Sequence, residues 1–202
     1  MGRIRDRAFD LAGSDPVILM AGGNASGKTT FSYQLIRQGF LGAIVDSPWV
    51  AESDVRKVLN RRREPWVIYV ERDFEEAFLF MVLRAADEGR MVDPSEIART
   101  HAEVPAALLR AMALFRNQPR VSCWHLQNNA PNLSLAQAIG GPLHRDGKDA
   151  LISIRMREES RSRSDFEQAA RTTWNQFKQA VETRHQNPYP ADLAHEIESR
   201  MP

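Results

Sequence analysis

The sequence predicts an α/β protein of three layers, with helices on both faces of a mostly parallel sheet. Three observations support this prediction. Short apolar runs typical of buried strands alternate along the chain with segments whose apolar residues recur at helical spacing. A glycine-rich loop joins the first of these strands to the first helix. The chain has 202 residues, 43% of them hydrophobic, which is enough to build one packed core.

Three strands are predicted in the first part of the chain. Residues 17–21 form a continuous apolar run between Pro16 and Gly22, the pattern of a strand buried on both faces. Shorter apolar runs predict a second strand that ends at Asp46 and a third strand at 67–70. The helices predicted in this part cover residues 28–38, with Gly39 as the stop, and a short segment around 55–59.

Helices predominate between the third strand and a fourth strand predicted at 121–126. Asp73 and Glu76 resemble a capping box at the start of a helix that Gly89 ends. The helix starts predicted in this part are Asp73, Asp93 with Pro94, and Pro105.

The last quarter of the chain predicts one more strand and a long helix. Residues 150–154 are interpreted as a fifth strand, and Ser164 with Glu167 as the cap of an amphipathic helix. This helix is expected to pack on the same domain, with docking of a partner as the alternative. We therefore predict a nucleotide-binding domain over 1–155 and a helical C-terminal extension over 156–202.

The glycine-rich loop matches the P-loop pattern of glycine, four residues and then Gly-Lys-Ser/Thr. Glycines let the backbone fold around an anion, and the next helix directs its N-terminal N–H groups at the phosphates. In this pattern Lys28 reaches the β- and γ-phosphates, and the Thr29 hydroxyl ligates Mg²⁺. The predicted nucleotide-binding residues are Gly22, Gly23, Asn24, Ala25, Ser26, Gly27, Lys28, Thr29 and Thr30, together with Asn128 and Asn129 after the fourth strand. The side-chain amides of these two asparagines can read the edge of an adenine base, or can simply form a loop turn.

Three further residues are candidates for the chemistry. Asp46 ends the second strand, where it can help to bind Mg²⁺, take a proton from an attacking hydroxyl, or merely cap a turn. Arg84 and Arg90 flank Gly89 and can neutralise a transferring phosphate, or can simply be solvated charges at a helix end. The predicted catalytic residues are Lys28, Asp46, Arg84 and Arg90, and the predicted metal ligands are Thr29 and Asp46.

Composition and net charge indicate which partners and which compartment to expect. The net charge is +1, which disfavours nucleic acid as a partner. The apolar run at 17–21 is too short for a membrane span, and the single cysteine, Cys123, excludes an internal disulfide. A cytoplasmic protein with no membrane association is expected.

Taken in order, several segments resemble the zeta toxin-like P-loop kinases over residues 16–130. They are the P-loop, Ile44–Ser47, Val67–Asp73, the Arg-Ala-x-x-Glu-Gly-Arg segment at 84–90, Pro94, Thr100-His101 and Asn128-Asn129. Zeta toxins phosphorylate UDP-N-acetylglucosamine with ATP or GTP, and a protein antitoxin holds them inactive. The resemblance implies a P-loop kinase-like fold, an arginine clamp made by Arg84 and Arg90, and Asn129 near the base.

The chain departs from that family at points that bear on the acceptor. The stretch between the P-loop helix and the third strand is short, although in the toxins this region helps to form the sugar-nucleotide pocket. Asn128 stands where many relatives have Asp, and Asp93 precedes Pro94 where valine is usual. The short stretch favours the alternative of a non-catalytic nucleotide-binding module acting through a protein partner, whereas the retained arginines favour a kinase.

Overall fold

The structure is a computed structural model and describes residues 16–128, 144–183 and 191–201. Its strands are β1 (Val17–Ala21), β2 (Ala43–Asp46), β3 (Pro65–Glu71), β4 (Ser122–Gln127) and β5 (His144–Asp146). Its helices are α2 (Lys28–Arg37), α3 (Glu52–Asn60), α4 (Phe74–Glu88), α5 (Pro94–Ala113), α7 (Gly147–Ser160), α8 (Arg163–Thr183) and α9 (Ala191–Ser199). No helix in this part of the chain is both long and apolar enough to cross a membrane.

The strands form one sheet in the order β2-β1-β3-β4-β5. The first four run parallel, and β5 joins the edge antiparallel to β4. The register places Met20 beside Asp46 and Ala21 beside Tyr69, so the carboxyl ends of β1, β2 and β3 meet at one edge. Ligands gather at this edge in open parallel sheets, and the glycine-rich loop begins here.

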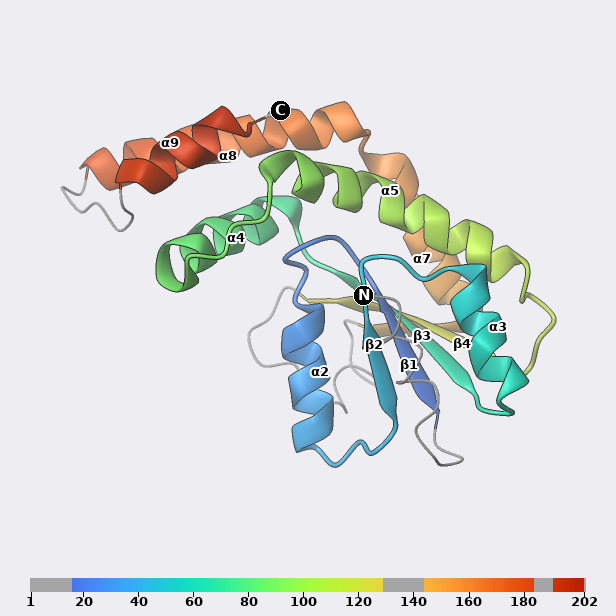
Figure 1. Ribbon diagram of the computed structural model, residues 1–202. Coiled ribbons are helices and arrows are strands. Elements are labelled where there is room, and N and C mark those ends of the chain that lie inside the picture. The colour runs from blue at the N-terminus through green and yellow to red at the C-terminus, as the bar shows by residue number, and fades with distance from the viewer. Residues whose placement is uncertain (1–15, 129–143, 184–190, 202) are drawn as a thin grey trace.

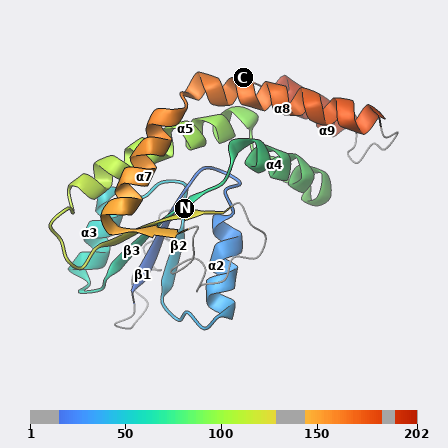
Figure 2. The ribbon, with the colours of Figure 1, turned by 180° about the vertical axis from the view of Figure 1, so that it is seen from behind.

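Helices cover both faces of the sheet, which confirms the predicted three-layer α/β/α arrangement (Figures 1 and 2). On one face, Phe31 and Leu35 of α2 are buried against the apolar side chains of β1 and β3. On the other face, α3, α5 and α7 contribute Val58, Leu108 and Ile154 to a second apolar cluster. Because β1 is apolar on both sides, its burial is complete and it forms the centre of the core.

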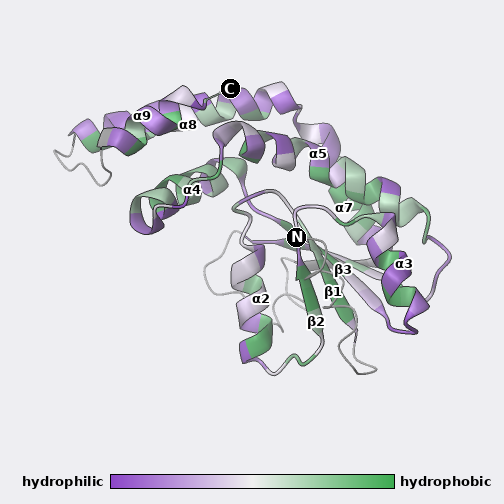
Figure 3. Ribbon diagram, viewed as in Figure 1, coloured by the Kyte–Doolittle hydropathy of each residue, from purple (hydrophilic) through white to green (hydrophobic). Residues whose placement is uncertain are grey.

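A third apolar cluster lies among the helices beyond the carboxyl ends of the strands. The bulky side chains of α4 and α8 meet there, with Phe74, Phe78 and Phe166 almost fully buried. Figure 1 shows α8 and α9 side by side along the top of the molecule, over α4 and the first half of α5. Their outer faces are largely hydrophilic, whereas β1 and β2 are strongly hydrophobic (Figure 3). The C-terminal helices therefore pack on the rest of the chain.

Residues 150–154 are helical, so the prediction of a strand there is wrong. They belong to α7, which buries Ala150 and Ile154 on one side and exposes Ile152 on the other. A short apolar run fits either a strand or a turn and a half of helix, and the burial at i and i+4 decides for the helix. The fifth strand is instead β5, just before α7. The helix also runs across the boundary predicted between residues 155 and 156.

Pro105 does not open a helix, because it lies inside the continuous helix α5. Proline removes one backbone N–H from a helix and costs stability. Pro105 is nevertheless buried, and its neighbours Val104 and Leu108 belong to the apolar cluster that packs on the sheet. Burial of apolar surface opposes the cost of the lost hydrogen bond.

The helix ends were predicted with mixed success. Asp93 caps α5 by accepting a hydrogen bond from the N–H of Ser95, and Gly89 ends α4 with φ of 65°. Asp73 precedes α4 as expected, but its side chain makes no capping hydrogen bond. The cap of α8 lies two residues earlier than predicted, since Ser162 and Asp165 exchange side-chain to backbone hydrogen bonds.

Candidate functional site

The loop between β1 and α2 has the conformation of an anion cradle. Gly27 caps α2 with φ of 95°, a left-handed conformation that glycine adopts without strain. Ala25 is also left-handed, with φ of 61°. Helix α2 begins at Lys28, so its first backbone N–H groups have no partner within the helix and face the loop. This arrangement suits a bound phosphate.

Three glycines of the loop are packed so closely that no side chain fits. A Cβ on Gly22 would lie 2.2 Å from the carbonyl oxygen of Val70, at the end of β3. A Cβ on Gly23 would lie 2.2 Å from the ring of His101, and one on Gly27 would lie 2.1 Å from the side-chain nitrogen of Asn128. The loop is therefore held from β3, from α5 and from the end of β4.

Helix α5 makes two polar contacts with the tip of the loop. The backbone N–H of Asn24 donates to the hydroxyl of Thr100 over 2.9 Å, and Nε2 of His101 lies 3.0 Å from the carbonyl oxygen of Asn24. Burial lowers the pKa of His101 to about 4, against the opposing effect of the Asn24 carbonyl. The imidazole is therefore neutral at physiological pH and donates its Nε2–H to that carbonyl.

Lys28 is folded back onto the loop. Its Nζ donates to the carbonyl oxygens of Gly22 and Gly23 over 2.9 and 2.8 Å, and only 7% of the residue is exposed. Burial lowers its pKa to about 8, although the charge of Asp46 opposes the shift. A phosphate in the cradle would offer this buried ammonium group the counter-charge that the two carbonyls only partly supply.

Thr29 and Asp46 form the second polar feature of the cradle. The hydroxyl of Thr29 donates to Oδ2 of Asp46 over 2.6 Å, because β2 lies next to β1 and ends beside the first turn of α2. A hydroxyl and a carboxylate are oxygen ligands of the kind that Mg²⁺ prefers, and Mg²⁺ takes its remaining ligands from phosphates and water. The pair fits the metal role predicted for it. Elsewhere among the described residues, no cluster of His, Cys, Asp and Glu could hold a metal ion.

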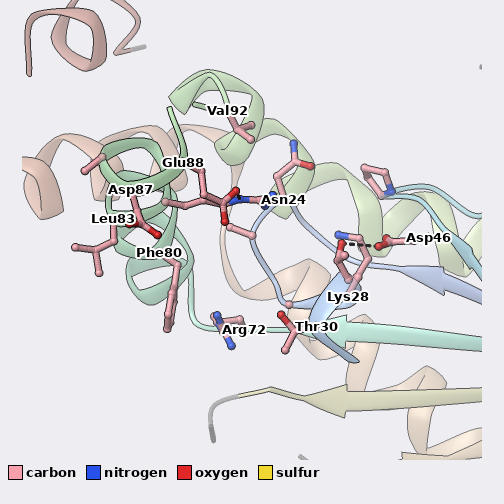
Figure 4. A pocket seen from close by; sticks show the side chains of 16 residues that line it. Asn24, Lys28, Thr30, Asp46, Arg72, Phe80, Leu83, Asp87, Glu88 and Val92 are labelled. Carbon is pink, nitrogen blue, oxygen red and sulfur yellow. Dashed lines mark hydrogen bonds and ion pairs between the residues drawn. The ribbon is translucent and has the colours of Figure 1, made fainter. Parts of the chain in front are cut away.

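A cavity of about 800 Å³ opens in front of the loop, within the usual size range of small-molecule sites. The loop, the first turn of α2 and Asp46 form one side of it, and α4 forms the opposite wall (Figure 4). Asn24, Ala25, Gly27, Lys28, Thr29 and Thr30 of the predicted set all line this cavity. The α4 wall carries Phe80, Leu83, Arg84, Asp87 and Glu88.

The structure does not bring the two predicted arginines together. Arg84 lines the main cavity, where its Nε donates to Glu88 over 2.8 Å. Arg90 lines a different cavity of about 530 Å³, together with Asp192 and Arg200 from the C-terminal end of the chain. In this conformation, then, the clamp is not assembled.

Asn128 lies behind the loop, where it holds the backbone. Its side-chain amide donates to the carbonyl of Ser26 over 2.8 Å, and it is 8% exposed. Its backbone N–H donates to the carbonyl of Glu71 over 2.7 Å. A contact with the nucleotide base stays a prediction for Asn128, and Asn129 lies outside the described residues.

Sequence reasoning gave no role to Arg72, although it lines the cavity. It follows the last residue of β3, and its Nε donates to the carbonyl of Asn128 over 3.1 Å. Its guanidinium carbon lies 4.3 Å from the centre of the Phe80 ring. The available signal was its place at the carboxyl end of a central parallel strand, the same argument that singled out Asp46.

A buried polar network holds the carboxyl end of β3 in place, next to Arg72. Glu71 lies 2.7 Å from Nε2 of His125 and 2.7 Å from Nε of Arg157. The other ring nitrogen of His125 lies 2.8 Å from the hydroxyl of Ser153 on α7. The network joins β3, β4 and α7, so the end of β3 has a rigid support.

No protein-family model matches this chain, and no curated protein sequence matches it either.

Proposed function

We propose that the chain is a P-loop kinase that transfers the γ-phosphate of ATP or GTP to a hydroxyl group of a small molecule. The observation that carries the proposal is the pairing of a glycine-lined cradle with the Thr29–Asp46 hydrogen bond of 2.6 Å at its mouth. Groups suited to bind phosphate and Mg²⁺ therefore lie next to each other, which supports phosphoryl transfer as the reaction.

The residues of the cradle have distinct tasks in this proposal. The backbone N–H groups at the start of α2 bind the phosphate chain, and Lys28 leaves the loop carbonyls to neutralise it. When bound, Mg²⁺ supplies charge neutralisation at the β- and γ-phosphates. Thr29 and Asp46 would hold the ion. Because the Asp46 carboxylate accepts a hydrogen bond from the Thr29 hydroxyl, its position favours the role of metal helper over that of general base.

The arginines act later in the proposed cycle. Arg84 sits in the cavity wall, where a phosphate would compete with Glu88 for its guanidinium group. About half of each side chain in this ion pair is exposed, so water screens it and the pair is easily exchanged. Arg90 would need a rearrangement at Gly89 to join Arg84, and the left-handed glycine at this point makes such a change inexpensive.

UDP-N-acetylglucosamine is the first acceptor to test, because the resemblance to zeta toxins implies it. The cavity of about 800 Å³ is large, but a nucleoside triphosphate would take much of it. An antitoxin-like protein partner is likewise a proposal that rests on the resemblance.

The second candidate is a non-catalytic nucleotide-binding module acting through a protein partner. One observation favours it: Arg84 is tied to Glu88, and Arg90 lies in another cavity. Binding alone needs no arginine clamp, whereas transfer does.

Incubation with Mg²⁺ and ATP or GTP, followed by mass spectrometry of the acceptor, separates the two candidates. With UDP-N-acetylglucosamine present, we expect a product heavier by one phosphate. Lys28→Ala and Asp46→Asn should abolish it, while Lys148→Ala, an exposed lysine at the start of α7, should leave it unchanged. Nucleotide binding that depends on Lys28, without transfer to any of a panel of hydroxyl acceptors, would instead support the binding module.

A further inference from the structure

Arg72 is anchored at two points on the floor of the main cavity. The ring of Phe80 lies against the guanidinium group at 4.3 Å, and the carbonyl of Asn128 accepts a hydrogen bond from Nε. Cation–π stacking and a hydrogen bond from the same planar group leave its orientation little freedom. Figure 4 shows it between Thr30 at the start of α2 and Phe80 on the opposite wall.

Both anchors leave the terminal nitrogens available. Among the described residues, neither Nη1 nor Nη2 of Arg72 makes a hydrogen bond, since only Nε is engaged. Nη2 lies close to the cradle, because a Cβ built on Gly27 would be 3.4 Å from it. The free donors therefore stand at the flank of the phosphate-binding loop.

The other cations of the cavity already have hydrogen-bond acceptors in this structure. Lys28 donates hydrogen bonds to two carbonyl groups of the loop, and Arg84 forms an ion pair with Glu88. Acidic groups are abundant, with Asp46, Asp87 and Glu88 among the lining residues. A polyanionic ligand entering this cavity needs a fixed positive group beyond Lys28, and Arg72 is the lining arginine that has no acidic partner within hydrogen-bond distance in the described chain.

We propose that Arg72 is a phosphate-binding residue of the nucleotide site, which Phe80 and the Asn128 carbonyl hold ready beside the loop. This inference rests on the proposed nucleotide-binding function and adds to it a cation that the P-loop pattern does not contain. Guanidinium groups bind phosphate oxygens through two parallel N–H donors, and both donors of Arg72 are free for this task. The loop then supplies backbone N–H groups on one side of the phosphate chain and Arg72 supplies charge on another.

Calorimetric titration of the full chain with ATP and with inorganic tripolyphosphate tests the assignment. Arg72→Gln should weaken the binding of both ligands at least tenfold, because a charged hydrogen bond to phosphate is lost. Arg72→Lys keeps the charge but loses the fork and the stacking, so it should recover only part of the affinity. Phe80→Leu should cause a smaller loss than Arg72→Gln for both ligands, because it removes a support and leaves the cation. Arg116→Gln, an exposed arginine outside the cavity, is the matched control and should bind as the wild type does.

Urea unfolding of each variant separates a direct contact from a structural one. We expect Arg72→Gln to lower the unfolding midpoint only slightly, through loss of the Nε hydrogen bond and the ring contact, while affinity falls at least tenfold. A large fall of the midpoint together with the affinity would overturn the assignment. Weakened binding of ATP with unchanged binding of tripolyphosphate would also overturn it, because Arg72 would then contact the nucleoside. If the wild type binds both ligands and Lys28→Ala does not, unchanged binding by Arg72→Gln rejects this inference alone. If the wild type binds neither ligand, the proposed function fails as well.

Discussion

The side-chain amide of Asn128 donates a hydrogen bond of 2.8 Å to the backbone carbonyl of Ser26, although 102 residues separate the two in the sequence. Asn128 also accepts a hydrogen bond from Arg72 through its own carbonyl. The end of β4 is thus tied to both the loop and the proposed phosphate-binding cation.

Replacing this amide by a carboxylate tests the hydrogen bond between Asn128 and Ser26. Asn128→Asp cannot donate to Ser26 and would place an anion beside the carbonyl, so we expect it to lower the free energy of unfolding by about 2 kcal/mol. Nucleotide binding should weaken as well. Urea denaturation and calorimetry measure the two effects, with Asn117→Asp in an exposed turn as the control. A variant as stable as the wild type would show that the hydrogen bond is dispensable.

The close approach of Gly23 to His101 gives a prediction for a double mutant. In Gly23→Ala the new methyl group would overlap the imidazole, and we expect a loss of about 2 kcal/mol in stability. His101→Ala removes the obstacle, so the double variant should be less destabilised than the sum of the single variants by about 1 kcal/mol. Chemical denaturation of the four proteins gives this coupling energy. Pairing Gly23→Ala with the distant Val58→Ala should give simple additivity.

Nucleotide binding should be accompanied by proton uptake near pH 8. The pKa of Lys28 is about 8 in the free protein, so roughly half of the molecules carry a neutral amine at that pH. Bound phosphate favours the ammonium form, and we expect about half a proton to be taken up. Calorimetry in buffers of different ionisation enthalpy measures it. The uptake should vanish at pH 6, where Lys28 is already charged, and in Lys28→Arg.

Acid should destabilise the protein through His101. Its pKa is about 4 in the folded chain and 6.5 ordinarily, so between these values the unfolded chain binds a proton that the folded chain does not. The free energy of unfolding therefore falls as the pH drops from about 6.5 to 4, by about 3 kcal/mol in total.

A matched pair of variants isolates this contribution from that of the carboxylates. His101→Gln cannot ionise but can still donate to the Asn24 carbonyl, so its stability should depend less on pH across this window. His195→Gln, at an exposed position in α9, should keep the wild-type pH dependence. Urea denaturation at pH 7.5, 5.5 and 4.5 follows all three proteins, and equal slopes for His101→Gln and the wild type would contradict the prediction.

The sequence was informative where structure depends on local chemistry. The pattern Gly22–Thr29 and the apolar run before it predict β1, the loop and α2. These predictions depend on the spacing of glycines and on a continuous apolar run, and both are visible in a short stretch of sequence. The position of Asp46 at the end of a strand was also predicted from the sequence. Its 2.6 Å contact with Thr29 could not be predicted, because it depends on the order of the strands, which no local pattern contains.

Sequence reasoning failed where tertiary contacts decide. Residues 150–154 are apolar enough for a strand, but they lie in a helix that buries Ala150 and Ile154 in the core cluster. Arg72 has only its place at the carboxyl end of β3 to distinguish it from the other arginines of the chain. Its role emerges only when α4 brings Phe80 over it and β4 brings the Asn128 carbonyl beside it.

Pro105 divides α5 into two parts that contact different elements of the fold. The part before it brings Thr100 and His101 to the loop and packs with α8 through Ile97 and Ala98. The part after it buries Leu108 against the sheet. Since Pro105 has no N–H to give to the His101 carbonyl, bending the helix here breaks one hydrogen bond fewer than bending it elsewhere. A tilt of the first part would displace the tip of the loop, to which Thr100 and His101 are hydrogen-bonded. If a bound phosphate shifts the tip of the loop and the first part of α5 with it, the free energies of binding and of tilting are coupled, and each changes the other by the same amount.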